Sequence, residues 1–454
     1  MSTTTLRGRP PRSRGPKKAS GPAVVSPLPG EKQTHSADPA QAKASSRLAT
    51  IEGIPSAVAL GIVNNYVVPC ALALRATTFQ VGMLSAVPQL GAALAQLKAP
   101  DLMDRLKSPK KTLLISVLLG ALPFLALAGI APVGTPSVVW WLLSFSTMAL
   151  VLYNLPNAAW GTWVSAIVPA STRGWFLGVR SSISAAATII AFLACGWLLD
   201  LMDGRVLVGF SAIFAIAAVS RVVSFLLFTR MHEPAGSYVQ APRASLREAI
   251  RALSRNNMGR FLFWYGAIMF SASMSGPFFA VYMLRDLHFS YTTYTFLTMV
   301  PSITSVVAPF LFGRLADRRG NVKMLRVITW GISITPAMWL VSHAIPWIVF
   351  VQLFAGAMWA GFQLVTLNFV YSASTETERP ANIAYLFVVN GIAAACGNLL
   401  GGAIAPHLPA LFGYSLLTLF ALSGTLRGLA SLTLLPRVRE QSKAPAPEKT
   451  ATAA

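Results

Sequence analysis

The chain reads Gly313-Arg314-Leu315-Ala316-Asp317-Arg318-Arg319-Gly320 between two long apolar segments, and this charged stretch decides the fold. A related stretch, Leu102-Met103-Asp104-Arg105, places its aspartate 213 residues earlier. Other pairs recur at similar separations: Pro69 and Pro277 are 208 residues apart, and Arg173 with Arg379 and Arg221 with Arg427 are each 206 apart. A chain of 454 residues that repeats itself at about half its length, within apolar sequence, predicts two copies of one membrane bundle.

The composition is that of a membrane protein. Hydrophobic residues make up 54% of the chain and charged residues 11%, whereas soluble domains carry about 25% charged residues. The net charge of +22 raises the question of nucleic acid. The basic residues, however, fall in tails and in loops between apolar runs, which is typical of cytoplasmic loops and excludes a folded basic face. We therefore expect a lipid bilayer as the partner and no nucleic acid.

Twelve apolar segments follow residue 53, and each is long enough to cross about 30 Å of hydrocarbon as a helix. Helix is expected because only hydrogen bonds within the segment can satisfy the backbone in lipid. The predicted fold class is therefore all-α, with two pseudo-symmetric six-helix bundles. The segments are 54–74, 79–97, 112–131, 138–168, 178–199, 206–229, 261–284, 291–313, 325–343, 347–372, 382–406 and 413–435.

The distribution of Lys and Arg predicts the orientation. With the N-terminus inside, 32 of the 37 basic residues face the cytoplasm. The outside carries three, Arg75, Arg205 and Arg285. This asymmetry predicts a multi-pass protein of the cell (inner or plasma) membrane with both termini cytoplasmic.

The same pattern divides the chain into five parts. The tails 1–48 and 437–454 hold few large apolar residues, so both are expected to be disordered, the first as a basic cytoplasmic tail. Bundles are expected at 49–229 and 261–436, joined by a cytoplasmic linker at 230–260. Within the linker, Ser245 and Glu248 have capping-box spacing. A short helix on the membrane surface and a plain soluble connector are both open.

The charged stretch that ends at Gly320 closely resembles the loop that joins the second and third helices in each half of the major facilitator superfamily. The first-half copy matches at Leu102, Asp104 and Arg105, but Pro100 and Lys107 replace the expected glycines. The resemblance covers residues 50–436 and implies a secondary transporter. Its two bundles would rock about a central site and open to one side at a time.

The resemblance also implies a gating latch at the cytoplasmic ends. Asp104 would meet the helix start near Asn382 and Asp317 the helix start near Phe176, because exposed N–H groups and the helix dipole favour a carboxylate there. Such a latch would close the cytoplasmic side and break when it opens. The alternative is that these charges only set topology. The latch residues are Asp104, Arg105, Arg173, Asp317, Arg318 and Arg379.

In the family, the first and fourth helices of each half line the binding cavity. Polar side chains on these segments must find partners in the bundle interior, either a substrate or another helix, and both remain open. The candidates for substrate binding are Asn64, Asn65, Asn154, Asn157, Trp160, Ser273, Trp359, Gln363 and Asn368.

Two arginines, Arg221 and Arg427, lie inside apolar segments. A charge at that depth is costly and usually functional. We expect both to snorkel towards the headgroups or to bond helix-end carbonyls. An anion site is the alternative. Glu52 and Asp200 are expected at segment ends. The interior is therefore expected to hold no carboxylate that would indicate proton coupling.

The motifs indicate a transporter of a small organic solute and no enzyme, because no catalytic constellation, metal spacing or phosphate loop is recognisable. No cofactor is expected, and the protein is expected to be a monomer. The three cysteines are expected to be small buried hydrophobes. A multidrug or metabolite efflux transporter and a non-transporting membrane scaffold or receptor with this fold are the alternatives.

Overall fold

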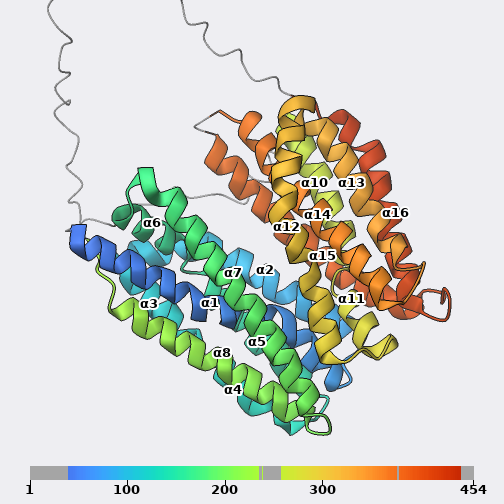
Figure 1. Cartoon of the computed structure of the whole chain (residues 1–454), viewed down its shortest axis with the longest axis horizontal. Coiled ribbons are helices and arrows are strands. Elements are labelled where there is room, and N and C mark those ends of the chain that lie inside the picture. Colours follow the sequence, from blue (N-terminus) through green and yellow to red (C-terminus); the bar gives the residue numbers. More distant parts are fainter. Residues whose placement is uncertain (1–38, 235–237, 239–256, 376–377, 441–454) are drawn as a thin grey trace, which may run out of the picture.

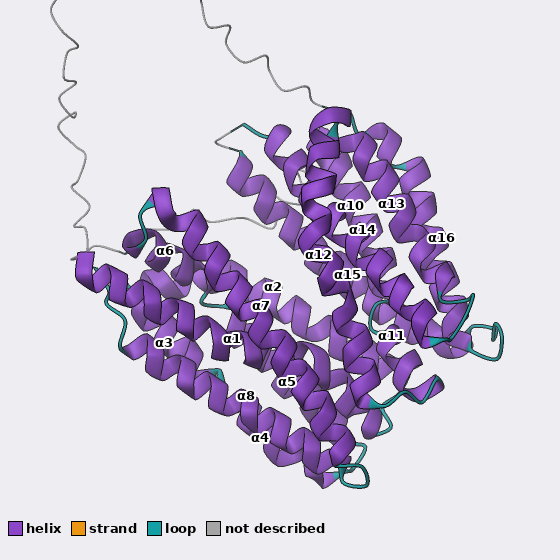
Figure 2. Ribbon diagram, viewed as in Figure 1, coloured by secondary structure: helices purple, strands orange, loops and turns teal. Residues whose placement is uncertain are grey.

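The structure, a computed structural model, describes residues 39–234, 238, 257–375 and 378–440. Apart from one isolated bridge between Leu411 and Tyr414, the regular secondary structure of this part of the chain is helical (Figure 2). Ten segments in these ranges are long and apolar enough to cross a membrane. Helices α2 (Thr78–Leu106) and α13 (Asn321–Met338) complete the twelve predicted spans.

Each predicted apolar segment overlaps a helical span, although the segment 325–343 runs past the end of α13 at Met338. Several spans consist of two helices in line. The first bundle contains α1 (Pro39–Ala73), α2, α3 (Pro109–Leu119) with α4 (Ala121–Ile130), α5 (Val138–Asn154) with α6 (Asn157–Ile167), α7 (Ala170–Leu201) and α8 (Val206–Thr229). The second contains α10 (Asn257–Ser275) with α11 (Phe278–Val281), α12 (Tyr291–Arg319), α13, α14 (Ile345–Ser372), α15 (Arg379–Ile404) and α16 (Ser415–Thr433).

The boundaries differ from the prediction at both tails. Helix α1 begins at Pro39, within the part predicted to be disordered, because its first turns find partners: the Ser45 hydroxyl accepts a hydrogen bond of 2.9 Å from the His232 backbone N–H. After α16, the Arg439 N–H donates to Asn257 over 2.8 Å, so this start of the second tail is also bonded. The predicted linker helix around Ser245 lies outside the described residues.

The twofold repeat extends to the capping of two helices. At the start of α3, the Lys110 N–H donates to Glu233 over 3.0 Å. At the start of α13, Asn321 N–H and Val322 N–H donate to Glu440 over 2.9 and 2.6 Å. Glu440 follows Glu233 by 207 residues. Each carboxylate thus satisfies free N–H groups at a positive helix terminus.

The two copies of the charged loop differ at one backbone position. Gly320 has φ 88° and ψ 153°, a region that is essentially restricted to glycine. Lys107 occupies the matching position with φ 47° and ψ 25°, which is left-handed helical and open to other residues at a cost. The glycine missing from the first copy is therefore replaced by a different turn and not by strain at the same angles.

The bundles lie side by side and diverge towards one end (Figure 1). This basic end carries the loops around Lys107, Arg173, Gly320 and Arg379, with the start of α1 and the end of α16. At the opposite end, which we call the closed end, α2 packs on α15 and α7 on α12. The approach there is close: a Cβ atom on Gly82 would lie 2.6 Å from the Asn398 carbonyl oxygen.

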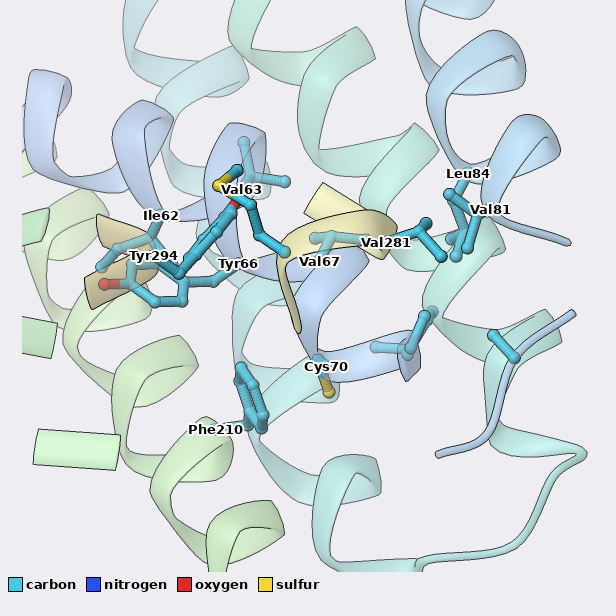
Figure 3. Packing of buried hydrophobic residues seen from close by; sticks show 14 of the residues in the cluster. Ile62, Val63, Tyr66, Val67, Cys70, Val81, Leu84, Phe210, Val281 and Tyr294 are labelled. Atoms are coloured by element: carbon cyan, nitrogen blue, oxygen red, sulfur yellow. The ribbon is translucent and has the colours of Figure 1, made fainter. Parts of the chain in front are cut away.

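A buried apolar core crosses the boundary between the bundles at the closed end. It combines residues of α1 and α8, such as Val67 and Phe210, with Val281 and Tyr294 of the second bundle (Figure 3). Two further clusters occupy the basic halves of the two bundles, one in each. The described apolar packing between bundles is therefore concentrated at one end.

Replacing Gly401 with Ala should destabilise the second bundle, because its Cβ would collide with the Met274 carbonyl oxygen of α10. We expect a loss of about 1–3 kcal/mol, the usual cost of overpacking, and a lower midpoint of thermal unfolding in detergent. Gly129→Ala in α4 is the control, because no atom lies within 4 Å of its added Cβ. Equal midpoints for the two variants would contradict this packing.

Candidate functional site

Asp200, at the end of α7, links the bundles at the closed end. Its two carboxylate oxygens accept hydrogen bonds of 2.8 Å each from the backbone N–H groups of Tyr291 and Thr292, at the start of α12. The helix dipole adds to these charge-assisted bonds. The sequence predicts aspartates at helix starts of the basic end, and the structure places this one at the other end.

Aromatic rings continue the contact towards the centre. The Tyr66 hydroxyl donates to the Phe192 carbonyl over 2.5 Å, and the Phe192 ring lies edge-on to Tyr294 with centroids 6.3 Å apart. The Tyr294 hydroxyl in turn donates to the Asn65 carbonyl over 3.4 Å. These contacts join α1, α7 and α12 and close the space between the bundles on that side.

A buried charge cluster lies in the other half of the first bundle. Glu52 of α1 is 1% exposed, and one of its oxygens pairs with Arg180 of α7 at 2.8 Å. The second oxygen accepts from the Ser224 hydroxyl of α8 over 2.6 Å. Arg180 lies over the Trp160 ring at 4.4 Å and Arg221 over the Tyr153 ring at 5.1 Å. The cluster thus joins α1, α5, α6, α7 and α8.

Two neighbouring cavities border this cluster. The larger, of about 290 Å³, lies between α1 and α7, with Asn64 and Asn65 on one side and Ser184 and Thr188 on the other. The smaller, of about 90 Å³, extends towards Arg221, Asn157 and Trp160. Ser56, Tyr153 and Arg180 line both. Amides, hydroxyls and guanidinium groups can bind a polar solute here without any covalent step.

The predicted substrate contacts of the first bundle therefore come together, with one exception. Asn64 and Asn65 line the larger cavity, and Asn157 and Trp160 the smaller. Asn154 instead accepts hydrogen bonds of 3.3 Å from Gln96 of α2 and from Asn157, which is the interhelical alternative.

The second bundle contributes none of the residues that line these two cavities. Trp359 packs its ring edge-on against Phe362 at 5.7 Å, Ser273 and Asn368 are half-buried, and Gln363 is exposed. Other aromatics of α10 and α14 pack on one another: Tyr265 and Phe362 stack at 5.8 Å. The four predicted residues of this half stay a prediction.

Snorkelling of the two intramembrane arginines is wrong, because Arg221 and Arg427 are 2% and 3% exposed. The other part of that expectation, bonding to carbonyls, applies to Arg427, which donates to Ile332 and to Ala272 near the end of α10. Arg427 donates to the hydroxyls of Ser275 and Ser423 over 2.8 Å each and to the Ile332 carbonyl over 3.0 Å. These partners lie on α10, α13 and α16, so this guanidinium ties three helices together.

The latch residues make other contacts in this structure. Asp104 accepts from the Tyr238 hydroxyl over 2.5 Å, and Asp317, Arg105 and Arg318 are not buried. Arg173 donates to the Ser165 and Val168 carbonyls of its own bundle. Arg379 lies over the Tyr371 ring at 5.2 Å. Within the described residues, Asp317 is exposed and makes no contact with the helix start near Phe176, which is the arrangement expected for an open basic end.

Sequence reasoning missed the Glu52–Arg180 pair. Glu52 lies just before the predicted segment 54–74 and Arg180 in the first turn of the segment 178–199, where a charge is explained equally well by topology. The available signal was their opposite charge on the first and fifth segments, together with hydroxyls at Ser181, Ser182 and Ser184. No group of three His, Cys, Asp or Glu side chains that could hold a metal occurs within the described ranges.

Comparison with known proteins gives a family match and a fold match. The sequence profile of the Major Facilitator Superfamily matches residues 53–279 and 261–454. No curated protein matches the sequence significantly.

Solved transporters share the fold at low identity. A mutant of the nucleoside transporter NupG has a TM-score of 0.72 at 13% identity, covering 87% of this chain and 100% of its own. A D-xylose–proton symporter has 0.68 at 14%, covering 89% and 98%. A bacterial homologue of the lysosomal transporter Spinster, solved inward-facing and unoccupied, has 0.66 at 13%, covering 90% and 100%.

Replacing Asp200 with Asn should loosen the closed end, because the start of α12 loses a charged acceptor. We expect Cys195, now 4% exposed beside this contact, to react with a maleimide about 5- to 30-fold faster, the effect of one to two kcal/mol. Cys70 and Cys396 are first replaced by Ala.

Asp203→Asn is the matched control. It removes the same charge from the same turn, and the Asp203 side chain accepts from its neighbour Gly204 N–H. An unchanged rate in Asp200→Asn, or an equal rise in the control, would show that Asp200 does not keep this end closed.

Proposed function

The chain belongs to the major facilitator superfamily and is a secondary membrane transporter of a small solute, and we propose that this structure is its inward-open state. The observation that carries the proposal is the position of the contacts between bundles: Asp200 binds the start of α12, and Tyr294 contacts Phe192 and the Asn65 carbonyl, both at the closed end. The basic end, rich in Lys and Arg, would face the cytoplasm.

The transport cycle then alternates between two closures. The closed end opens when Asp200 leaves the start of α12. The basic end closes when Asp317 and Asp104 reach the helix starts near Phe176 and Asn382. Both closures use the same physics, a carboxylate on the free N–H groups of a helix terminus, so the bundles can exchange one for the other at little net cost.

The substrate would bind in the two cavities of the first bundle, contacted by Asn64, Asn65, Asn157 and Trp160. Gln363 and Asn368 would approach when the basic end closes. A polar solute fits this lining, because the amides of Asn64, Asn65 and Asn157 and the hydroxyls of Ser56, Ser184 and Thr188 border the two cavities. The protein would act as a monomer in the cell membrane, with both termini cytoplasmic.

Proteoliposomes test transport itself. Purified protein should give saturable flux of at least one polar solute from a panel of sugars, nucleosides and small organic acids, measured in both directions so that uptake and efflux are separated. Empty liposomes provide the background. Specific binding of a partner protein, without flux of any solute, would favour the membrane scaffold or receptor instead.

Replacing Asp317 with Asn tests the latch. Loss of one charge at a helix terminus, about 0.3–1 kcal/mol, should shift the population about two- to fivefold towards opening at the basic end. The readout is the reaction of a cysteine at Asn64 with an impermeant maleimide applied from the cytoplasmic side. Asp101→Asn, which removes a charge paired with Lys98 at the same end, is the control. Equal labelling rates in the two variants would show that the loop charges set only the membrane topology and form no latch.

A further inference from the structure

Arg221 is a buried cation whose hydrogen bonds are incomplete. It is 2% exposed, and its Nη1 donates to the Ser56 hydroxyl over a long 3.5 Å. Its Nε and Nη2 atoms have no hydrogen-bond partner within the part of the chain that the structure describes. Leaving charged donors buried and unpaired costs several kcal/mol, so such a group needs an explanation.

The matching arginine of the second bundle shows that a buried arginine at this position of the fold can make more hydrogen bonds. Arg427, 206 residues later, donates from its two Nη atoms to two hydroxyls and to carbonyls of α13 and α10. It borders neither cavity. Arg427 is therefore a structural cross-link that lacks a partner only at Nε, whereas Arg221 also has an unbonded Nη2 and lines the smaller cavity.

The charge around Arg221 does not balance. Both oxygens of Glu52 are engaged, one by Arg180 at 2.8 Å and one by Ser224 at 2.6 Å. Glu52 therefore neutralises Arg180, and one positive charge, that of Arg221, remains within this buried cluster. The nearest polar groups, Ser56 and the Tyr153 hydroxyl, are neutral hydrogen-bonding groups that can also donate to an anion.

The smaller cavity at Arg221 adjoins the larger cavity, because Ser56, Tyr153 and Arg180 line both. We propose that the smaller cavity is the subsite for the carboxylate of a monoanionic organic solute, bound by Arg221 with Tyr153 and Ser56. The remainder of the solute lies in the larger cavity against the amides of Asn64 and Asn65. This inference rests on the proposed transport function and names its substrate class.

A carboxylate fits better than a phosphate ester. One negative charge cancels the excess positive charge, and a planar guanidinium matches a carboxylate with paired hydrogen bonds. A dianionic phosphate would add a second negative charge next to Glu52. A cavity of about 90 Å³ also favours the smaller headgroup.

Ligand-induced thermal stabilisation tests the subsite directly, because a ligand that binds the folded state raises its unfolding temperature. The probes are lactate, gluconate and benzoate, each compared with its amide, and methyl phosphate. At least one acid should stabilise the purified protein at concentrations where its amide has no effect. In Arg221→Gln the affinity for that acid should fall at least tenfold, and in Tyr153→Phe about threefold or more.

Two control variants remove a positive charge elsewhere. Arg205→Gln changes an exposed residue just before α8 and should bind the acid as the unchanged protein does. Arg427→Gln should lower the unfolding temperature but keep the preference for acid over amide. Because the two controls separate loss of stability from loss of the anion site, the test does not depend on any one variant folding well.

Several results would overturn the subsite: no stabilisation by any of the acids, equal effects of acids and amides, stronger binding of methyl phosphate, or an acid preference that survives Arg221→Gln. Flux of the same compounds separates this inference from the transport function. Acid-selective binding without flux would contradict the transport function but support the carboxylate subsite. Flux of a neutral solute, with no acid preference in binding, would do the reverse.

Discussion

Two backbone N–H groups at the start of α12, bound by one carboxylate of α7, link the two bundles at the closed end. Asp200 has both oxygens on Tyr291 and Thr292, and the aromatic contacts of Tyr66, Phe192 and Tyr294 continue inward from that point. The contacts depend on close approach of helices, which glycines such as Gly82 permit. Because this end is closed, we expect a solute to reach the cavities beside Asn64 and Arg221 from the basic end.

Comparing the two halves of the repeat distinguishes features that stabilise the fold from features that could recognise the solute. Features present in both halves, such as the caps made by Glu233 and Glu440, stabilise the bundles at equivalent places. Features present in one half break the symmetry. The Glu52–Arg180 pair has no counterpart 206–208 residues later, where Met258 to Arg260 and Leu386 to Val388 contain no acid. Recognition of an asymmetric solute requires such a difference between otherwise similar bundles.

Much of this architecture could be predicted from sequence, because lipid leaves the backbone few choices. Apolar length and the repeat at Asp104 and Asp317 were sufficient to place twelve spans. Pairing between side chains was not predictable in the same way. Arg221 and Arg427 occupy equivalent places in the repeat, and the Nε atom of each lacks a partner within the described residues. Both Nη atoms of Arg427 are nevertheless bonded, with Ser275 and Ser423 among the acceptors, whereas Nη2 of Arg221 is not. The difference lies in what neighbouring helices present, and no local pattern encodes it. The predicted position of Glu52 was wrong for a related reason. Helix α1 begins earlier than its apolar core, so a residue predicted at the segment end lies inside the helix.

Distances measured at both ends of one molecule test the rocking motion most directly. Spin labels at exposed Thr135 and Ala344 report the closed end, and labels at exposed Ser171 and Arg319 report the basic end. When solute or an Asp200 substitution changes the population, the first distance should lengthen as the second shortens. Two distances that change in the same direction, or one that changes while the other stays fixed, would contradict alternating access by these bundles.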